Sequence, residues 1–217
     1  WWWRSDMKIA RLVVGPVGTN CYILTDEETK AAAAVDPGAE GLAIAGALEA
    51  SGYRLKEILI THGHFDHICG AADLARETNA KIFMHESDVV MIDDPHLNFS
   101  AEFGMDAVGG FEPDVRLKGG ERLSLSVGEC DVLWTPGHTE GGVCYDFGDP
   151  LFVGDTLMRD SYGRCDGYRG DFETLKKSIE KLFALDGDRV VLPGHGQATS
   201  LDRERMYNPI STDGDER

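Results

Sequence analysis

Four short apolar runs in this chain each end at a residue type that binds metal ions. The runs cover residues 57–61, 132–137, 151–154 and 190–194, and apolar runs of this length bounded by Gly or Pro predict buried strands. They lead into the sequence HGHFDH at 62–67, His138, Asp155 and His195. Open α/β folds bind ligands where strands end. The sequence therefore predicts that five histidines and two aspartates converge on one site.

The HGHFDH sequence supplies four potential metal ligands within six residues. His62 and His64 are separated by one residue, so their side chains point the same way on an extended segment. Asp66 and His67 follow where the chain must turn before the next helix. A first metal ion could bind His62, His64 and His138, with the fourth position open for water, which is the pattern of catalytic zinc sites.

The remaining ligand-type residues are enough for a second metal ion. It could bind Asp66, His67 and His195, and the carboxylate of Asp155 could bridge the two cations. Five of the seven histidines belong to this pattern, whereas a single buried histidine is more often a core residue than a ligand. Two adjacent divalent ions usually indicate hydrolysis, because they activate water and offset developing negative charge.

The rest of the chain alternates between strand and helix patterns. Besides the apolar runs, strands are expected at residues 9–14, 21–25, 31–35, 81–84, 123–127, 131–135, 143–147, 151–153 and 190–192. Helices are expected at 39–51, about 70–78 and 172–184, and Leu42, Ala45 and Leu48 have the spacing of a helix face packed on a sheet. Two halves of this kind predict an α/β fold with two sheets face to face and helices outside.

Residues 92–120 lack clear periodicity and contain several apolar side chains, among them Phe99 and Phe103. A loop of this length in a compact domain is usually functional or disordered. Phe99 and Phe103 could cover the acyl part of a substrate. Alternatively, the loop covers a small satellite core of its own.

Length and charge restrict the class of protein. A chain of 217 residues with 42% hydrophobic residues suits one domain, which we expect over residues 7–217. Residues 1–6 lack the apolar region of a secretory signal and are expected to be a cloning leftover or a misassigned start, with Met7 as the native start. The net charge of −17 argues against nucleic acid as a partner. No apolar stretch approaches the roughly 20 residues of a membrane span.

Five widely spaced cysteines without a CxxC sequence fit a reducing compartment better than a disulfide-linked scaffold. We therefore expect a cytoplasmic protein that acts on a small molecule, without nucleic-acid or membrane partners. The sequence does not indicate an oligomeric state.

The motifs resemble those of the metallo-β-lactamase-fold hydrolases. The resemblance rests on THGHFDH at 61–67, PGHT at 136–139, GDT at 154–156 and PGHG at 193–196. Within that superfamily the chain is most similar to the glyoxalase II (hydroxyacylglutathione hydrolase) group, through TNCY at 19–22, GRCD at 163–166 and Asn208-Pro209. The resemblance spans roughly residues 7–210. It implies an αββα sandwich, two β-sheets flanked by helices, with a dinuclear metal site at its edge.

The resemblance also implies roles for the seven ligand-type residues. It assigns one metal to His62, His64 and His138, the other to Asp66, His67 and His195, and the bridge to Asp155. Asp66 and Asp155 are thereby implied as catalytic. The cofactors are expected to be two divalent metal ions, with zinc first and iron or manganese also compatible with mixed histidine and carboxylate ligands.

The chain departs from the glyoxalase II pattern in three places. Full-length glyoxalase II enzymes have a C-terminal helical region that contacts glutathione, whereas only 22 residues follow His195 here, so the chain resembles a short form without that domain. Cys69-Gly70 replaces the usual Gly-Gly, and Cys165 replaces the Thr of GRTD. Cys69 is expected near a helix N-terminus, where the helix dipole and the metals would lower the thiol pKa. Alternatively, it is only a packing residue.

These observations predict a metal-dependent hydrolase that cleaves a thioester with a metal-bridging hydroxide. A thiolate leaves easily, because its conjugate acid has a pKa of about 8.5, whereas an amine would need a proton donor that the motifs do not provide. Arg164 and Arg169 could contact an anionic substrate, although Arg164 could instead pair with Asp166 or Asp155.

Two other functions stay open. An iron-dependent persulfide dioxygenase shares this fold and would hold a single iron with the residues corresponding to His62, His138 and Asp155. A non-catalytic metal-binding protein is the second alternative. A β-lactamase is not expected, because zinc β-lactamases generally have a cysteine where Asp155 stands.

Overall fold

The computed structural model describes residues 7–105 and 108–212. The expectation of a foreign leader at residues 1–6 lies outside the described residues. None of the helices in the described part of the chain has the length and apolar composition needed to cross a membrane.

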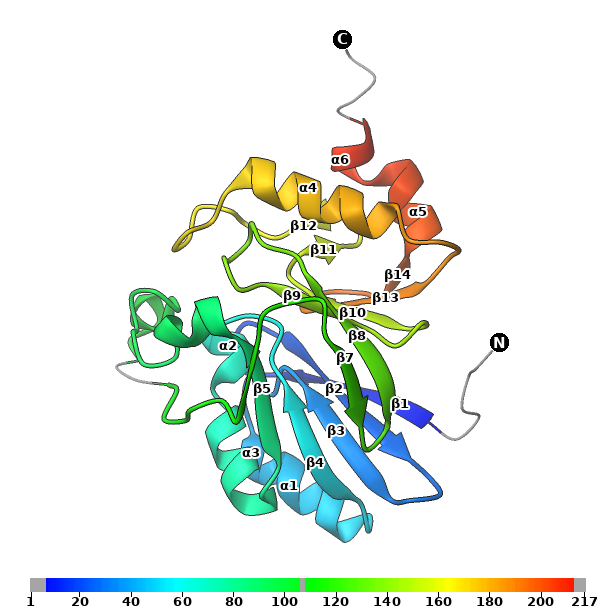
Figure 1. The fold of residues 1–217 in the computed structure, drawn as a ribbon. Helices are drawn as coiled ribbons and strands as arrows, with labels where there is room; N and C mark the ends of the chain where they lie inside the picture. The colour runs from blue at the N-terminus through cyan, green and yellow to red at the C-terminus, as the bar shows by residue number, and fades with distance from the viewer. Residues whose placement is uncertain (1–6, 106–107, 213–217) are drawn as a thin grey trace.

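The first sheet has six strands in chain order: β1 (Met7–Val14), β2 (Thr19–Asp26), β3 (Ala31–Val35), β4 (Arg54–Leu59), β5 (Lys81–His85) and β6 (Val115–Leu117). The first three are antiparallel, and β3 to β6 run parallel. Parallel neighbours need crossover connections, and helices α1 (Gly41–Ala50) and α3 (Ala71–Thr78) supply two of them. Both helices cover the outer face of this sheet (Figure 1).

The second sheet has the strand order β14-β13-β10-β9-β8-β7. Its strands are β7 (Arg122–Leu125), β8 (Gly128–Trp134), β9 (Val143–Asp146), β10 (Leu151–Gly154), β13 (Val190–Pro193) and β14 (Thr199–Ser200). Helices α4 (Phe172–Phe183) and α5 (Leu201–Tyr207) lie on its outer face, and α6 (Pro209–Thr212) follows (Figure 1). A small hairpin of β11 (Leu157–Met158) and β12 (Ser161–Tyr162) follows β10.

Three apolar layers hold the two sheets and the helices together. In β2, Ile23 belongs to the layer under α1 and α3, whereas Leu24 belongs to the layer between the sheets. In β10, Phe152 lies between the sheets and Val153 lies under α4. Because successive strand residues face opposite sides, strands covered on both faces need continuous apolar runs. The structure thus confirms the predicted sandwich of two sheets flanked by helices.

The prediction for the face of α1 was partly wrong. Ala45 and Leu48 are buried, but Leu42 is 56% exposed, and Ile44 takes the third buried position. The helix begins at Gly41, which is itself buried. The buried face of the helix therefore begins at Gly41 and continues through Ile44, Ala45 and Leu48. Leu42 lies on the exposed face.

Several short elements had no sequence signal strong enough to predict them. Helix α2 (Phe65–Ile68) lies inside the ligand sequence, and β6 and the 3-10 helix η2 (Ser100–Phe103) lie inside the long segment 92–120. Val108 and Phe111 of that segment pack against the core of the first sheet. The segment is therefore partly attached to the main core of the first sheet, whereas one of the two alternatives expected a small core of its own.

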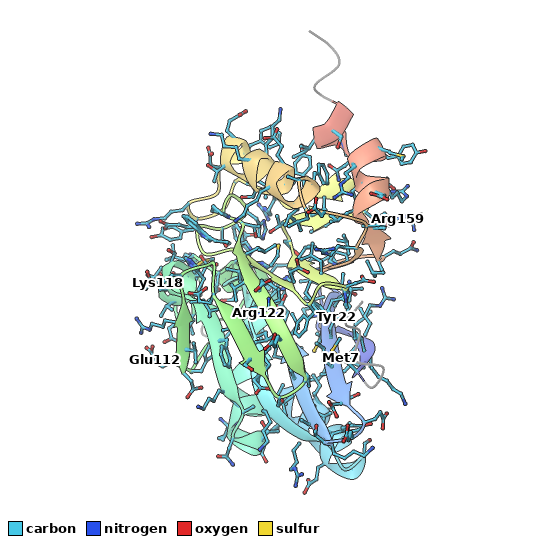
Figure 2. The ribbon with its side chains drawn as sticks, turned by 45° about the vertical axis from the view of Figure 1, so that its right-hand side comes forward. Met7, Tyr22, Glu112, Lys118, Arg122 and Arg159 are labelled. Atoms are coloured by element: carbon cyan, nitrogen blue, oxygen red, sulfur yellow. The ribbon has the colours of Figure 1, made fainter. Side chains whose placement is uncertain are left out.

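Positively charged side chains are distributed over separate elements. Lys118, Arg122 and Arg159 lie well apart in Figure 2. Arg122 also pairs with Glu129 and Asp131, at 2.8 and 3.3 Å.

Candidate metal centre

The seven predicted ligand residues come together where strands of both sheets end. They lie after β4 (His62 and His64), in α2 (Asp66 and His67), after β8 (His138), after β10 (Asp155) and after β13 (His195). The site is therefore shared between the two halves of the sandwich. This is the convergence that the sequence predicted.

His62, His64 and His138 form the first group. Their ring centroids are 4.8 Å apart for His62 and His64 and 4.6 Å apart for the other two pairs. The Nε2 atoms of His62 and His138 are 3.2 Å apart. One ligand atom of each residue lies within 4.8 Å of the others, so a single cation placed among them could contact all three.

Asp66, His67 and His195 form the second group. Oδ2 of Asp66 is 3.4 Å from Nε2 of His67 and 3.1 Å from Nε2 of His195. This group contains the carboxylate and the two imidazoles that the sequence assigned to a second metal.

Asp155 lies between the two groups. Its Oδ2 is 3.7 Å from Nε2 of His138 in the first group and 3.6 Å from Nε2 of His195 in the second. Its Oδ1 is 3.6 Å from Nε2 of His67. One carboxylate thus faces both groups, which is the position of a bridging ligand.

A second observation also indicates that the donor atoms of this site suit metal ions. Within the described residues, five buried side-chain polar atoms lack a hydrogen-bond partner, and three of them are Nε2 of His64, Nε2 of His67 and Oδ1 of Asp155. An unsatisfied buried polar atom costs about 1–3 kcal/mol. Orphaned lone pairs that share one small space indicate ligands for divalent metal ions.

Gly194 allows the backbone to pass close to the side chains of Asp155 and His67. A Cβ atom at position 194 would lie 2.2 Å from Oδ1 of Asp155 and 2.6 Å from Cε1 of His67. No side chain fits there without displacing a ligand. The Pro-Gly-His sequence at 193–195 therefore brings His195 to the site, because the residue before it has no side chain to collide with the other ligands.

Asp36 supports two of the histidines and was missed as a functional residue. Its Oδ2 accepts a hydrogen bond from Nδ1 of His67 at 2.9 Å and another from Oγ1 of Thr61 at 2.6 Å. Since the Thr61 hydroxyl donates to Asp36, it accepts from Nδ1 of His62, 3.0 Å away. Both imidazoles then keep their Nε2 lone pair for a metal, as in carboxylate–histidine–metal sites. The sequence did give a signal, because Asp36 directly follows the apolar run 31–35.

Asp88 ties the two ligand loops of the first group together. Its Oδ2 accepts from the backbone N–H of Gly63 at 3.0 Å and from Oγ1 of Thr139 at 2.7 Å, and its Oδ1 accepts from the N–H of Gly141. Gly63 separates His62 and His64, and Thr139 follows His138. Burial raises the pKa of Asp88. Asp88 lies in a 3-10 helix (Glu86–Met91) without any motif, so sequence reasoning had no signal for it.

Protonation differs between the histidines. Burial lowers the pKa of His62 and of His64 well below 6.5, so both imidazoles are neutral at pH 7, which is the form that binds metals. Burial alone would also lower the pKa of His67, but the charges of Asp66, Asp36 and Asp155 outweigh it and raise the pKa to about 10. A cation at His67 would therefore replace a proton.

Phe99 lies over the first group. Its ring centroid is 4.8 Å from that of His64, and the Arg164 guanidinium lies over the Phe99 ring, 4.6 Å from its centroid. Arg164 also forms a two-bonded pair with Asp166, at 2.7 and 2.9 Å, and its carbonyl accepts from Nδ1 of His138 at 2.7 Å. Phe103 is 52% exposed and packs on Phe65 of α2 at 4.7 Å. The long segment therefore contributes to the site as well as to the core.

Arg169 and Cys69 take different positions. Arg169 pairs with Glu140 and lies over the ring of Tyr168. Cys69 lies between α2 and α3, and Gly70 caps α3. Burial raises the pKa of the Cys69 thiol to about 12, with Asp66 adding to the effect. In the metal-free protein burial therefore outweighs the helix end, and the shift of this pKa is opposite to the expected direction. All five cysteines are free.

The two-sheet sandwich and the cluster of histidines and aspartates define a class of metal-dependent enzymes, most of them hydrolases. The sequence matches the metallo-β-lactamase superfamily over residues 14–195. The chain belongs to this family.

Relatives in the family include enzymes that are named for different activities. The chain is 33% identical to the hydroxyacylglutathione hydrolase GloC of Haemophilus influenzae, over 94% of this chain and 98% of GloC. The B3 metallo-β-lactamase BLEG-1 superposes with a TM-score of 0.89 at 31% identity, over 94% of this chain and 100% of BLEG-1.

Two further solved structures are similar to the chain, one of them with metal bound. TTHA1623 in a di-iron-bound form has a TM-score of 0.81 and 31% identity, over 92% of this chain and 98% of that one. ETHE1 from Myxococcus xanthus has a TM-score of 0.78 and 27% identity, over 94% of this chain and 85% of ETHE1. The family, the fold and the ligand cluster together indicate a metal-binding protein of the metallohydrolase type.

Proposed function

We propose that this protein is a dinuclear metallohydrolase that cleaves a small-molecule thioester. The observation that carries the proposal is the position of Asp155, whose two oxygens face Nε2 atoms of both ligand groups at 3.6 to 3.7 Å. The first ion would bind His62, His64 and His138, and the second would bind Asp66, His67 and His195. The likeness to a protein solved with two irons supports two ions, and zinc is the metal we propose first.

Bound divalent ions would supply Lewis acidity, lowering the pKa of water and offsetting negative charge on the carbonyl oxygen. The protein itself fixes which ring nitrogen of these histidines keeps a proton. Asp36 keeps the proton of His67 on Nδ1, and the carbonyl of Arg164 does the same for His138. The carboxylates of Asp155 and Asp66 would offset part of the positive charge of two divalent ions.

A thioester suits this site because the leaving thiolate needs little help from an acid. The ionisable groups around the ligands are already engaged. Asp36 and Asp88 each accept three hydrogen bonds. An amine leaving group would need a proton from a group that the site holds ready, and these carboxylates are acceptors only.

The relationship to GloC supports a hydroxyacylglutathione-like substrate. The match covers 98% of GloC, so a protein with that activity in its name has the same extent as this chain. Glutathione recognition in such a protein would not depend on an additional C-terminal domain. Arg164 could contact a carboxylate of the thiol carrier, in exchange for its present pair with Asp166.

The test combines metal analysis with a substrate panel. Purified protein loaded with zinc, iron or manganese is assayed with S-lactoylglutathione, short and bulky thioesters, and a β-lactam. We expect two metal ions per chain and turnover of at least one thioester. Asp155→Ala should lower the metal content and abolish turnover, with exposed Asp73→Asn as control. Full activity of Asp155→Ala, or cleavage of the β-lactam alone, contradicts the proposal.

A persulfide dioxygenase is the second candidate, and the likeness to ETHE1 favours it. His62, His138 and Asp155 could hold a single iron, since Nε2 of His138 is 3.2 Å from Nε2 of His62 and 3.7 Å from Oδ2 of Asp155. Oxygen consumption with glutathione persulfide, by protein loaded with one iron, would support this function over hydrolysis. Tight metal binding with no turnover in either assay would support the non-catalytic alternative.

A further inference from the structure

The strand β2 begins with the sequence Thr19-Asn20-Cys21-Tyr22, and its polar side chains contact the loop that carries His195. Asn20 donates from Nδ2 to the carbonyls of Pro193 and Gly196, at 2.9 and 3.1 Å. The hydroxyl of Tyr22 donates to the same Pro193 carbonyl at 2.8 Å. Tyr22 lies where the N-terminal strands approach the second sheet (Figure 2). The backbone N–H of Asn20 adds a bond to the Gly194 carbonyl at 2.7 Å.

Thr19 contacts the second ligand group directly. Its Oγ1 donates to Oδ2 of Asp66 at 2.6 Å, and that oxygen is 3.1 Å from Nε2 of His195. The backbone of Thr19 also forms a β-bridge with His195. Thr19 and Asn20 are 0% and 1% exposed, so water does not compete for these bonds.

These contacts are confined to one of the two ligand groups. Asp66 and the His195 loop belong to the second group. The first group has supports of its own, because Asp88 connects its loops and the Arg164 carbonyl holds His138. Each group therefore has supports of its own, although Asp36 supports His67 in one group and, through Thr61, His62 in the other.

We propose that Thr19 and Asn20 are positioning residues that set the affinity of the second metal site and leave the first largely unaffected. The proposal rests on the dinuclear site proposed above. The Thr19 hydroxyl fixes which lone pairs of Asp66 face the cation, and Asn20 fixes the backbone that presents His195. Loss of such outer contacts typically lowers metal affinity by about 10- to 100-fold.

Stepwise cobalt(II) titration of metal-free protein, followed by visible spectroscopy, measures the two sites separately. Thr19→Val keeps the shape of the side chain and removes the hydroxyl. We expect one binding step, that of the second group, to lose about 10- to 100-fold in affinity, while the other step stays within about twofold of wild type. Thr19→Ser restores a hydroxyl and should restore the affected step. Thr78→Val, which removes a hydroxyl bonded within α3, is the matched control and should change neither step.

A second variant tests the Asn20 contacts independently. Asn20→Asp replaces the amide donor by a carboxylate that faces two carbonyl oxygens, so it should weaken the same step. Thermal unfolding of each metal-free variant shows whether it is folded, and Asn20→Asp carries the test if Thr19→Val has no unfolding transition. Unchanged titrations of both variants, or equal weakening of both steps, overturn the proposal. A single binding step in wild type would overturn the dinuclear site itself and this proposal with it.

Discussion

Replacing Asp36 by Asn should damage the metal centre without touching a metal ligand. Asp36 has a φ of 50°, a left-handed conformation that Asn adopts as readily as Asp. The substitution therefore changes hydrogen bonding and leaves the backbone unstrained. All three partners of the carboxylate are donors: the N–H of Thr61 at 2.7 Å, the hydroxyl of Thr61 at 2.6 Å and Nδ1 of His67 at 2.9 Å.

The consequence follows from the donor and acceptor pattern. If the amide oxygen of Asn keeps the Thr61 N–H, its NH₂ group faces His67 and the Thr61 hydroxyl. His67 must then accept at Nδ1 and carry its proton on Nε2. The Thr61 hydroxyl must turn and donate to Nδ1 of His62, which moves that proton to Nε2 as well. Both imidazoles lose the lone pair that a metal needs.

Two magnitudes can be stated for this variant. Loss of an outer partner of a ligand lowers metal affinity by about 10- to 100-fold, and two disturbed ligands place Asp36→Asn at the upper end. Hydrogen bonds to a charged group contribute about 1.5–3 kcal/mol. A loss of about 2 kcal/mol lowers Tm by roughly 4–8 °C in a chain of this size.

Metal affinity and metal-free Tm are measured separately for Asp36→Asn. Asp26→Asn is the matched control, because Asp26 is also buried but lies at the far end of β2, where its Oδ1 accepts from two turn amides. Wild-type metal affinity in Asp36→Asn would refute the tautomer argument. A lower Tm with unchanged metal binding would also refute it, because Asp36 would then only stabilise the fold.

Three further predictions follow from the same site. The pKa of His67 is raised to about 10, against about 6.5 in the unfolded chain, so protonation of His67 stabilises the metal-free protein fully below about pH 6.5. The urea midpoint of the metal-free protein should therefore fall as the pH rises toward 10. Saturating metal should remove this trend. Phe99→Ala should raise KM for bulky thioesters more than for small ones. Phe103→Ala should change KM equally for both kinds of thioester. Equal effects of the two variants would contradict the role of Phe99 as the side chain that covers His64. Peroxide should inactivate wild type and Cys69→Ala at the same rate, because burial raises the pKa of this thiol and keeps it protonated. Protection in Cys69→Ala would instead show that the Cys69 thiol is reactive.

The ligand residues could be predicted because they follow the ends of four strands: four of them come after β4, and the other three come after β8, β10 and β13. A buried strand has a visible apolar pattern, and the residue after it must lie at the sheet edge. His138, Asp155 and His195 are far apart in the sequence, yet the strand ends β8, β10 and β13 bring them together. The pattern required no knowledge of packing between the sheets. For the same reason the two-sheet architecture followed from the runs themselves.

The supporting residues could not be predicted in the same way. Asp88 acts through Gly63 and Thr139, which lie 25 and 51 residues away, and its own segment has no periodicity. Asp36 also follows a predicted strand, but Asp-Pro-Gly is typical of turns as well, so the pattern alone does not assign it to the site. For Cys69, the helix end was placed correctly, but the degree of burial decides the thiol pKa, and burial is a property of the packed molecule.

Each ligand group takes members from both halves of the sandwich. His62 and His64 follow a strand of the first sheet and His138 a strand of the second, while Asp66 and His67 meet His195 in the same manner. A cation in either group would therefore link the two sheets, and binding to the folded state alone adds stability as the metal concentration exceeds Kd. We therefore propose that residues 7–217 form one folding unit, since neither half contains a complete ligand group. The metal centre is then both the chemical site and a connection across the layer of Tyr22, Tyr145 and Phe152 that separates the two sheets.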